Sequence, residues 1–310
     1  MPPTLRVVSL LPSATEIVCA LGAGEQLVGI SHECDFPAEI RDRAVLTRAR
    51  IDASGSSAAI DAAVRGVIRD ALSIYAVDEA GLAALAPDVI VTQDLCEVCA
   101  VSLGDVRAAV ARLAHRDDIA IVTLTPTRLD DVLGDIERVA AALGREAAGR
   151  AVRAGLEERI AAVAARARGA STRPRVVSLE WIDPLMIGGT WMPELIELAG
   201  GTAVGAEAGR PAPTITIDDL RRLAPDVIVV KPCGFDLARA LGERAPLAAV
   251  RAAAPGARIV VTDGNAFFNR PGPRLVESLE IMAACVDPDR FADLAAVHHD
   301  AMVTLPAAAR

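Results

Sequence analysis

Four cysteines each follow the carboxyl end of a predicted buried strand, which is where α/β proteins bind their ligands. They are Cys34, Cys96, Cys99 and Cys233. Cys96 and Cys99 have the C-x-x-C spacing of zinc ligands and of redox pairs. Together the four thiolates could hold zinc or an iron–sulfur cluster, and one alone could coordinate the metal of a ligand. The alternatives are thiols that line a binding cleft and thiols that only pack.

Polar residues follow the ends of the first two predicted strands. Ser13 and Thr15 open a helix after the first strand, with Ser13 as its predicted N-cap. His32, Glu33 and Phe36 lie in a polar loop after the second strand. An imidazole binds cobalt and iron, so His32 is a candidate metal ligand; the alternative is a hydrogen-bonded loop histidine. We expect these five side chains to line a ligand site.

Aromatic residues in the second half of the chain concentrate at predicted strand ends and turns. Aromatic side chains make up only 3% of the sequence, so this concentration predicts a ligand with a large flat or apolar surface. The alternative is that some of them close the end of a sheet as core residues. The candidates, with one arginine of the same segment, are Trp181, Trp191, Phe267, Phe268 and Arg270.

The elements that must position these residues occur twice. The sequence RVVSL at 6–10 returns at 175–179, and the pattern L-x-x-LAPDVIV at 82–91 returns at 220–229. Both matches keep the same order and both include a strand-like run, which argues against chance. Two copies of one unit predict two similar lobes, with a ligand in the cleft between them.

A helical connection separates the two copies. From 129 to about 167 the chain is mostly Ala, Arg, Glu, Leu and Val without proline, which predicts one long helix or two consecutive helices. We therefore expect an N-terminal lobe at 1–127, a helical linker at 128–170 and a C-terminal lobe at 171–310. The expected fold class is α/β, with two Rossmann-like lobes around central parallel sheets joined by a long inter-lobe helix.

Composition and motifs exclude several classes of function. A net charge of −9 without a basic stripe argues against nucleic-acid binding. No apolar run is long enough for membrane insertion. The apolar segment 7–24 lacks a basic region before it and a small-residue cleavage site, which predicts a cytoplasmic protein with reduced cysteines. The sequence has no complete catalytic motif, so we expect no enzyme.

Several segments resemble the vitamin B12 and iron-siderophore substrate-binding proteins of ABC importers. They are SLLPSATE at 9–16, LVGIS at 27–31, DFP at 35–37, LAPDVI at 85–90 and FFNRPGPR at 267–274. The resemblance covers roughly 6–285 and holds in order as well as in content. It implies two Rossmann-like lobes joined by a long helix, with a corrinoid or a ferric chelate bound in the cleft.

Cobalamin is the nearer match within that family, because Trp181, Phe267, Phe268 and Arg270 fall at or near cleft positions of the cobalamin binder. We therefore expect a non-catalytic protein that binds cobalamin as its ligand. One alternative is a ferric-siderophore or heme binder. Another is a thiolate metal or iron–sulfur protein with a redox or enzymatic role, which would use the four strand-end cysteines.

The family's partner is an ABC permease, which meets one acidic residue of each lobe. The candidates here are Glu79 and Asp218, which lie one position out of register in the two repeats. Each is equally explained as a negative charge at the start of a helix. Because the family's importer proteins are exported, the permease is an expected partner only if this chain is exported too.

Overall fold

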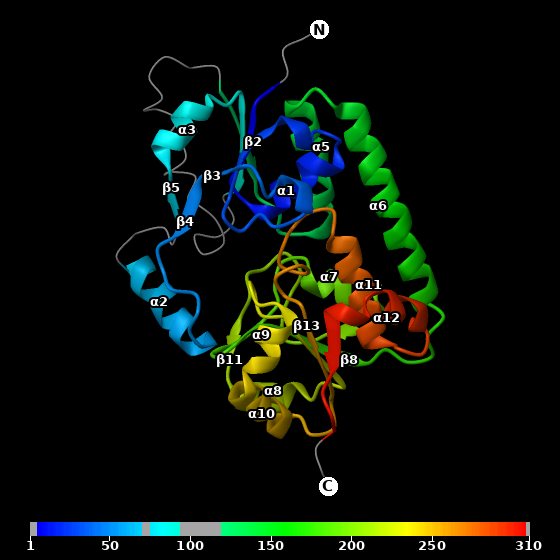
Figure 1. Ribbon diagram of the computed structural model, residues 1–310. Helices are drawn as coiled ribbons and strands as arrows, with labels where there is room; N and C mark the ends of the chain where they lie inside the picture. Colours follow the sequence, from blue (N-terminus) through cyan, green and yellow to red (C-terminus); the bar gives the residue numbers. More distant parts are fainter. Residues whose placement is uncertain (1–4, 70–74, 94–118, 308–310) are drawn as a thin grey trace. The chain divides into compact units, whose positions relative to one another are not determined.

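The computed structural model of the chain describes residues 5–69, 75–93 and 119–307 (Figure 1). Contacts divide the chain into two compact units. Unit 1 comprises 1–55, 62–126 and 130–155, and unit 2 comprises 56–61, 127–129 and 156–310. Two predicted site residues, Cys96 and Cys99, and the helix predicted at 106–114 lie outside the described residues.

Unit 1 is built on a parallel sheet with the strand order β3-β2-β1-β6-β7. Its strands are β1 (Val7–Ser9), β2 (Leu27–Ile30), β3 (Ala44–Val45), β6 (Val89–Gln93) and β7 (Ala120–Leu124). A separate antiparallel pair consists of β4 (Thr47–Ala49) and β5 (Tyr75–Val77). The core beside β1 joins both sheets, since Val8 and Ile90 pack in one buried cluster with Leu46 and Tyr75. The parallel sheet predicted for this half of the chain is confirmed.

The helices of the first half of the chain differ from the prediction at the end of α2 and decide between the alternatives for the connection. They are α1 (Pro12–Ala20), α2 (Ser57–Arg69), α3 (Glu79–Leu85), α5 (Leu129–Ala142) and α6 (Glu146–Ala167). The sequence predicts a helix over 57–75, but α2 ends earlier, because Tyr75 begins β5. Between α5 and α6 the chain turns at Gly144, whose φ is +63°. Gly149 then lets α6 approach α5, since a Cβ there would lie 2.5 Å from Cβ of Ala140. The connection is therefore two consecutive helices.

Unit 2 contains a larger mixed sheet with the order β11-β9-β8-β12-β13-β14, and β10 also pairs with β8. The strands are β8 (Arg175–Ile182), β9 (Leu185–Ile187), β10 (Thr202–Ala203), β11 (Thr214–Ile215), β12 (Val227–Val230), β13 (Arg258–Thr262) and β14 (Met302–Thr304). Its centre, β8-β12-β13, is parallel as predicted. β8 runs further than predicted and turns into an antiparallel hairpin with β9, so Trp181 lies within a strand and pairs with Met186.

Helices cover the sheet of unit 2 (Figure 1). They are α7 (Met192–Leu198), α8 (Ile217–Leu223), α9 (Leu237–Gly242), α10 (Arg244–Ala253), α11 (Leu275–Val286) and α12 (Ala292–Val297). α11 packs against α7, α12 and β12, and α10 packs against α8. Nearly every side chain of α11 is buried, which makes it the central helix of this unit.

The sequence repeat is also a repeat of structure. In unit 1 Val8 pairs with Ile90, and in unit 2 Val177 pairs with Ile228, so the repeated strands are neighbours in the same register. The helix before each second strand ends in a left-handed alanine, Ala86 with φ 41° and Ala224 with φ 43°. The predicted internal duplication is therefore confirmed at the level of hydrogen-bonded pairs.

The same hydrogen bonds close the amino-terminal edge of both sheets. The backbone N–H of Arg6 donates to Oδ2 of Asp88 at 2.8 Å, and that of Arg175 donates to Oδ2 of Asp226 at 2.7 Å. Each arginine also donates its Nε to a carbonyl at the end of the helix that precedes the second repeated strand. This carbonyl belongs to Leu85 in unit 1 and to Leu223 in unit 2. We call this arrangement of arginine, aspartate and helix end the edge latch.

One buried carboxylate in unit 1 predicts a pH-dependent stability. Asp135 on α5 is 1% exposed, and its only ion pair in the described structure is with Nη1 of Arg138 at 2.6 Å. Burial raises its pKa to about 6, and the Arg138 guanidinium offsets this only in part. Because the pKa is higher in the folded state, folding favours the protonated carboxyl. The free energy of unfolding therefore falls as the pH rises from about 4 to about 6.

We expect Asp135→Asn to stabilise unit 1 at pH 8 by about 1 to 3 kcal/mol and to give no gain at pH 4. Urea unfolding at both pH values measures the difference. Asp130→Asn is the matched control on the same helix, because its side chain is 82% exposed. Equal gains at pH 4 and pH 8 would contradict the assignment to Asp135.

No helix among residues 5–69, 75–93 and 119–307 combines the length and the apolar character that a bilayer span needs.

Candidate functional site

The hydroxyl groups at the carboxyl end of β1 are tied to the loop after β2. Oγ1 of Thr15 donates to Oγ of Ser9 at 2.8 Å and lies 3.0 Å from Sγ of Cys34. Thr15 is fully buried and Cys34 is 7% exposed. The structure thus brings two predicted site residues together, but as a packed contact that joins α1 to the next loop.

Ser13 does not cap α1, contrary to the prediction. The helix begins at Pro12, which is pre-organised for a first helical position, so the N-cap is Leu11 and Ser13 lies inside the first turn. Ser13 is 1% exposed, and its Oγ has no hydrogen-bond partner among the described residues.

His32 is held in one orientation at the exposed end of β2. Its Nδ1 lies 2.6 Å from Oγ1 of Thr47, and its backbone N–H donates to the same oxygen at 3.0 Å. The ring meets Tyr75 edge to face at 5.2 Å. The loss of hydration around the ring lowers the pKa of His32, and the neighbouring Glu33 carboxylate partly offsets this. A neutral imidazole with its proton on Nδ1 keeps the lone pair of Nε2 for a metal.

Two further predicted residues lie beside His32. The hydroxyl of Tyr75 donates to Oε1 of Glu33 at 2.7 Å, which fixes that carboxylate. Phe36 is 45% exposed, an unusual position for a large apolar side chain. His32, Glu33 and Phe36 therefore form the accessible part of the predicted site in unit 1.

Two predicted site residues of unit 2, Trp181 and Cys233, are accessible. The indole Nε1 of Trp181 donates to the carbonyls of Ser57 and Asp183, at 3.2 and 3.1 Å. Its ring packs edge to face on buried Phe235 and remains partly exposed. Cys233 is exposed, and its backbone N–H donates to the Glu180 carbonyl at 3.1 Å. The end of β8 and the end of β12 are thus joined by the backbone.

Trp191 and Phe268 are core residues, which is the alternative that the sequence left open for some aromatics. Phe268 is 1% exposed and Trp191 is 6% exposed. The indole Nε1 of Trp191 donates to the Phe268 carbonyl at 2.9 Å, and the Phe268 N–H donates to Oγ of Ser278 at 2.8 Å. These bonds hold Phe268 in a left-handed conformation with φ 67°.

Phe267 and Arg270 lie in the same segment with different surroundings. Phe267 is partly exposed and has the Arg274 guanidinium 5.5 Å from its ring centre. The ring of His298 meets it edge to face at 6.3 Å. Arg270 is 7% exposed and donates its Nη2 to Oδ1 of Asn265 at 3.1 Å. Of the two, Phe267 is the more exposed, while Arg270 braces the loop.

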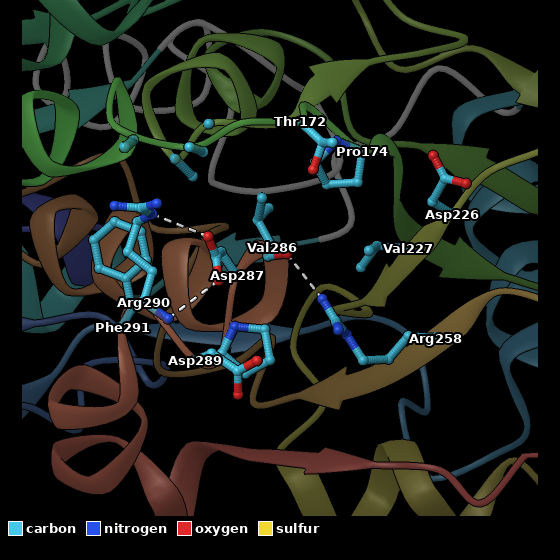
Figure 2. A pocket seen from close by; sticks show the side chains of 15 residues that line it. Thr172, Pro174, Asp226, Val227, Arg258, Val286, Asp287, Asp289, Arg290 and Phe291 are labelled. Atoms are coloured by element: carbon cyan, nitrogen blue, oxygen red, sulfur yellow. Dashed lines mark hydrogen bonds and ion pairs between the residues drawn. The ribbon is translucent and has the colours of Figure 1, made fainter.

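A pocket of about 290 Å³ opens at the opposite edge of the sheet of unit 2 (Figure 2). It surrounds the first residues of β12 and β13, whereas the predicted site residues follow the carboxyl ends of these strands. Arg258 points toward the end of α11 and donates to the carbonyls of Cys285 and Val286. Arg290 donates its Nε to Asp287 at 3.0 Å. Arg258 thus joins β13 to the end of α11, and Arg290 bonds within the turn that follows α11, so the pocket is lined by structural contacts.

Comparison with known proteins identifies the family. Residues 7–260 match the family model described as periplasmic binding protein. The chain belongs to the periplasmic binding protein family. Two vitamin B12-binding proteins, of Pectobacterium atrosepticum and of Pectobacterium carotovorum subsp. carotovorum, are each 22% identical to it over 87% of this chain and 84% of their own length.

Solved structures share the fold of this periplasmic binding protein. The periplasmic heme-binding protein RhuT from Roseiflexus sp. RS-1 has a TM-score of 0.66 and 23% identity, covering 94% of this chain and 100% of RhuT. The periplasmic vitamin B12 binding protein BtuF of Vibrio cholerae has a TM-score of 0.63 and 19% identity, covering 94% and 98%. The predicted family and α/β fold are confirmed, and membership makes the protein a binding protein rather than an enzyme.

The proposed thiolate centre receives no support from the described part of this periplasmic binding protein. There, no three His, Cys, Asp or Glu side chains are grouped to hold a metal. Cys34 belongs to unit 1 and Cys233 to unit 2, while Cys96 and Cys99 are not described. Burial raises the pKa of Cys285 to about 12, as expected of a packed thiol.

The acidic candidates for permease docking are not equivalent. α3 is capped by Asp78, so Glu79 is its first residue, whereas α8 is capped by Thr216, so Asp218 is its second. Asp218 also pairs with Arg221 one turn along the helix. The offset seen between the sequence repeats is therefore real in the structure.

Sequence reasoning missed two polar residues at the carboxyl edge of the sheet of unit 2, Lys231 and Asn269. Lys231 directly follows β12 and has no exposed surface. Its Nζ donates to Oδ1 of Asn269 at 2.9 Å. The available signal was composition, because Lys231 is the only lysine in 310 residues.

Proposed function

We propose that this periplasmic binding protein binds a cobalamin-like corrinoid without catalysing a reaction. The observation that carries the proposal is the set of accessible side chains at the carboxyl edges of the two sheets. Phe36, Trp181 and Phe267 are exposed or partly exposed aromatic side chains, and His32 adds an exposed imidazole. Flat apolar rings and an imidazole suit a macrocycle that carries a metal. The names of the curated relatives, which match over 87% of this chain, favour cobalamin.

A heme or a ferric siderophore is the second candidate ligand. The heme alternative is favoured by the fold shared with RhuT, a periplasmic heme-binding protein. Imidazole binds iron as well as cobalt, so His32 suits both macrocycles. The two ligands therefore have to be separated by direct binding.

The deciding experiment mixes the purified protein with cyanocobalamin, with hemin and with a ferric siderophore, and follows each absorbance through gel filtration. Co-elution of cyanocobalamin is the expected result. If only hemin or only the siderophore co-elutes, that compound replaces cobalamin as the proposed ligand. If none co-elutes, the proposal that the protein binds a macrocycle or ferric chelate is rejected.

We expect His32→Ala to weaken binding of aquocobalamin about tenfold, which corresponds to about 1.4 kcal/mol. An imidazole can displace the cobalt-bound water of aquocobalamin but not the cobalt-bound cyanide of cyanocobalamin. Binding of cyanocobalamin should therefore stay within about twofold. His299→Ala is the matched control, since that side chain is 71% exposed in the terminal segment of unit 2. Equal weakening of both corrinoids would show that His32 contacts the ligand without coordinating cobalt.

We also propose that the protein acts in the cytoplasm, as a carrier, store or sensor of its ligand. The support is that 7–24 supplies β1 and α1, whose side chains are core of unit 1. Cell fractionation tests the location. Recovery with an envelope marker would instead favour service to an ABC permease, with Glu79 and Asp218 as the residues to substitute first.

A further inference from the structure

A single buried ammonium lies where three segments of unit 2 meet. Lys231 is the only lysine of the chain, and its side chain is 0% exposed. Taking an ammonium group out of water costs several kcal/mol unless it is paired and hydrogen-bonded. Arginine supplies every other fixed cation of this chain. Lys231 therefore has a local role that repays its burial.

The hydrogen bonds of Lys231 join three segments. Its Nζ donates to Oδ1 of Asn269 at 2.9 Å and lies 3.5 Å from Oε2 of Glu180. Asn269 answers by donating its Nδ2 to the carbonyl of Lys231 at 3.1 Å and to that of Gly264 at 2.8 Å. Because both carbonyls take the amide NH₂, the amide oxygen is fixed toward the ammonium.

The aliphatic part of the Lys231 side chain is also closely packed. A Cβ on Gly188 would lie 3.2 Å from Cε of Lys231 and 2.6 Å from Oγ of Ser178. Gly188 is therefore required for the approach of β9 to the lysine. Among the described residues, Oγ of Ser178 has no hydrogen-bond partner. Among the described residues, the ammonium makes its polar contacts with Glu180 and Asn269.

Each of the joined segments carries a candidate ligand residue. Glu180 precedes Trp181, Lys231 lies two residues before Cys233, and Asn269 lies between Phe268 and Arg270. Movement of the ammonium would change the placement of all three segments. We infer that Lys231 is a positioning residue, which holds Trp181 and Phe267 in their binding arrangement through Glu180 and Asn269. This inference rests on the proposed function, because it assigns those two rings to the ligand.

The electrostatics of the site agree with this role. Desolvation lowers the pKa of Lys231, while the Glu180 carboxylate favours the charged form. A rise in pH that removes the proton weakens the contact with Glu180. The ligand affinity of the wild type should therefore fall in alkaline solution. Removal of Glu180 should move that fall to lower pH.

The test compares Lys231→Met, Glu180→Gln and the wild type with cyanocobalamin or hemin, whichever the wild type binds. Lys231→Met is expected to weaken binding at least about tenfold and to flatten the pH profile. Glu180→Gln, a mild change at a partly exposed residue, is expected to shift the alkaline fall to lower pH. Arg258→Met is the matched control, because it removes a cation from the opposite edge of the same sheet. It should lower stability without changing affinity.

Hydrogen exchange gives a second readout that needs no ligand. In Lys231→Met, amides of 264–270 are expected to exchange at least about tenfold faster, with the remaining amides of unit 2 unchanged. If Lys231→Met does not fold, Glu180→Gln alone decides by its pH profile and its exchange. The positioning role would be overturned if the folded variants had the same ligand affinity, the same pH profile and the same amide exchange rates as the wild type. Failure of the wild type to bind either macrocycle would reject only the proposed function, since exchange still tests whether Lys231 orders the edge.

Discussion

Gly264→Ala is expected to lower the free energy of unfolding of unit 2 by at least about 3 kcal/mol. The segment after β13 crosses the end of β12 at Gly264 with backbone against backbone. A Cβ there would lie 2.6 Å from the carbonyl carbon of Lys231 and would also meet the carbonyl oxygen of Pro232. Neither atom can move without shifting the strand end. Urea unfolding, followed by the fluorescence of Trp181 and Trp191, measures the loss.

Gly256→Ala is the matched control for this close approach. Gly256 lies in the turn before β13, and nothing lies within 4 Å of the Cβ that alanine would add. The control should change stability by no more than about 1 kcal/mol. A Gly264→Ala protein as stable as the control would mean that the crossing is looser than described.

Phe268→Ala is expected to cost about 3 to 5 kcal/mol of unfolding free energy, because it empties a fully buried position. The side chain is 1% exposed, and its backbone is bonded to both Trp191 and Ser278. A ligand-contacting residue would instead lose affinity with little loss of stability. Unfolding and ligand titration on the same variant distinguish the two roles.

Phe36→Ala provides the comparison for Phe268. Phe36 is 45% exposed in unit 1, so its removal should change stability by about 1 kcal/mol or less. We expect it to reduce ligand affinity instead. If Phe268→Ala left stability intact while Phe36→Ala lost it, both assignments would be reversed.

The framework could be predicted because it repeats and because buried parallel strands have a distinctive composition. The runs at 7–9 and 89–93, with their copies in unit 2, are mostly apolar and buried on both faces, which few other elements allow. The end of α2 was missed because apolar residues of 70–75 do not differ in type from those of a helix. β14 was missed because its partner β13 lies some 40 residues away in the sequence, beyond any local pattern.

The sequence could predict at which edge of the sheet the site residues lie, but not which of their side chains are exposed. Position after a strand identifies the edge on which a side chain lies, and all described candidates except Trp181 and Trp191 follow a strand end. It does not say which of two neighbours turns inward. Phe267 and Phe268 are adjacent and of one type, yet a left-handed residue and two hydrogen bonds send only Phe268 into the core. Such orientation depends on α7 and α11, which pack from distant parts of the sequence.

The edge latch is the part of each unit that the two repeats build in the same way. Arg6 with Asp88, and Arg175 with Asp226, secure the amino-terminal edge of each sheet by the same bonds. In the described residues the carboxyl-terminal edges differ: one carries His32 and Phe36, the other Trp181 and Lys231. The two units thus share the bonds of one edge and differ, where they are described, in the side chains of the other. New ligand-binding loops could therefore be introduced at the carboxyl-terminal edges without disturbing the edge latch.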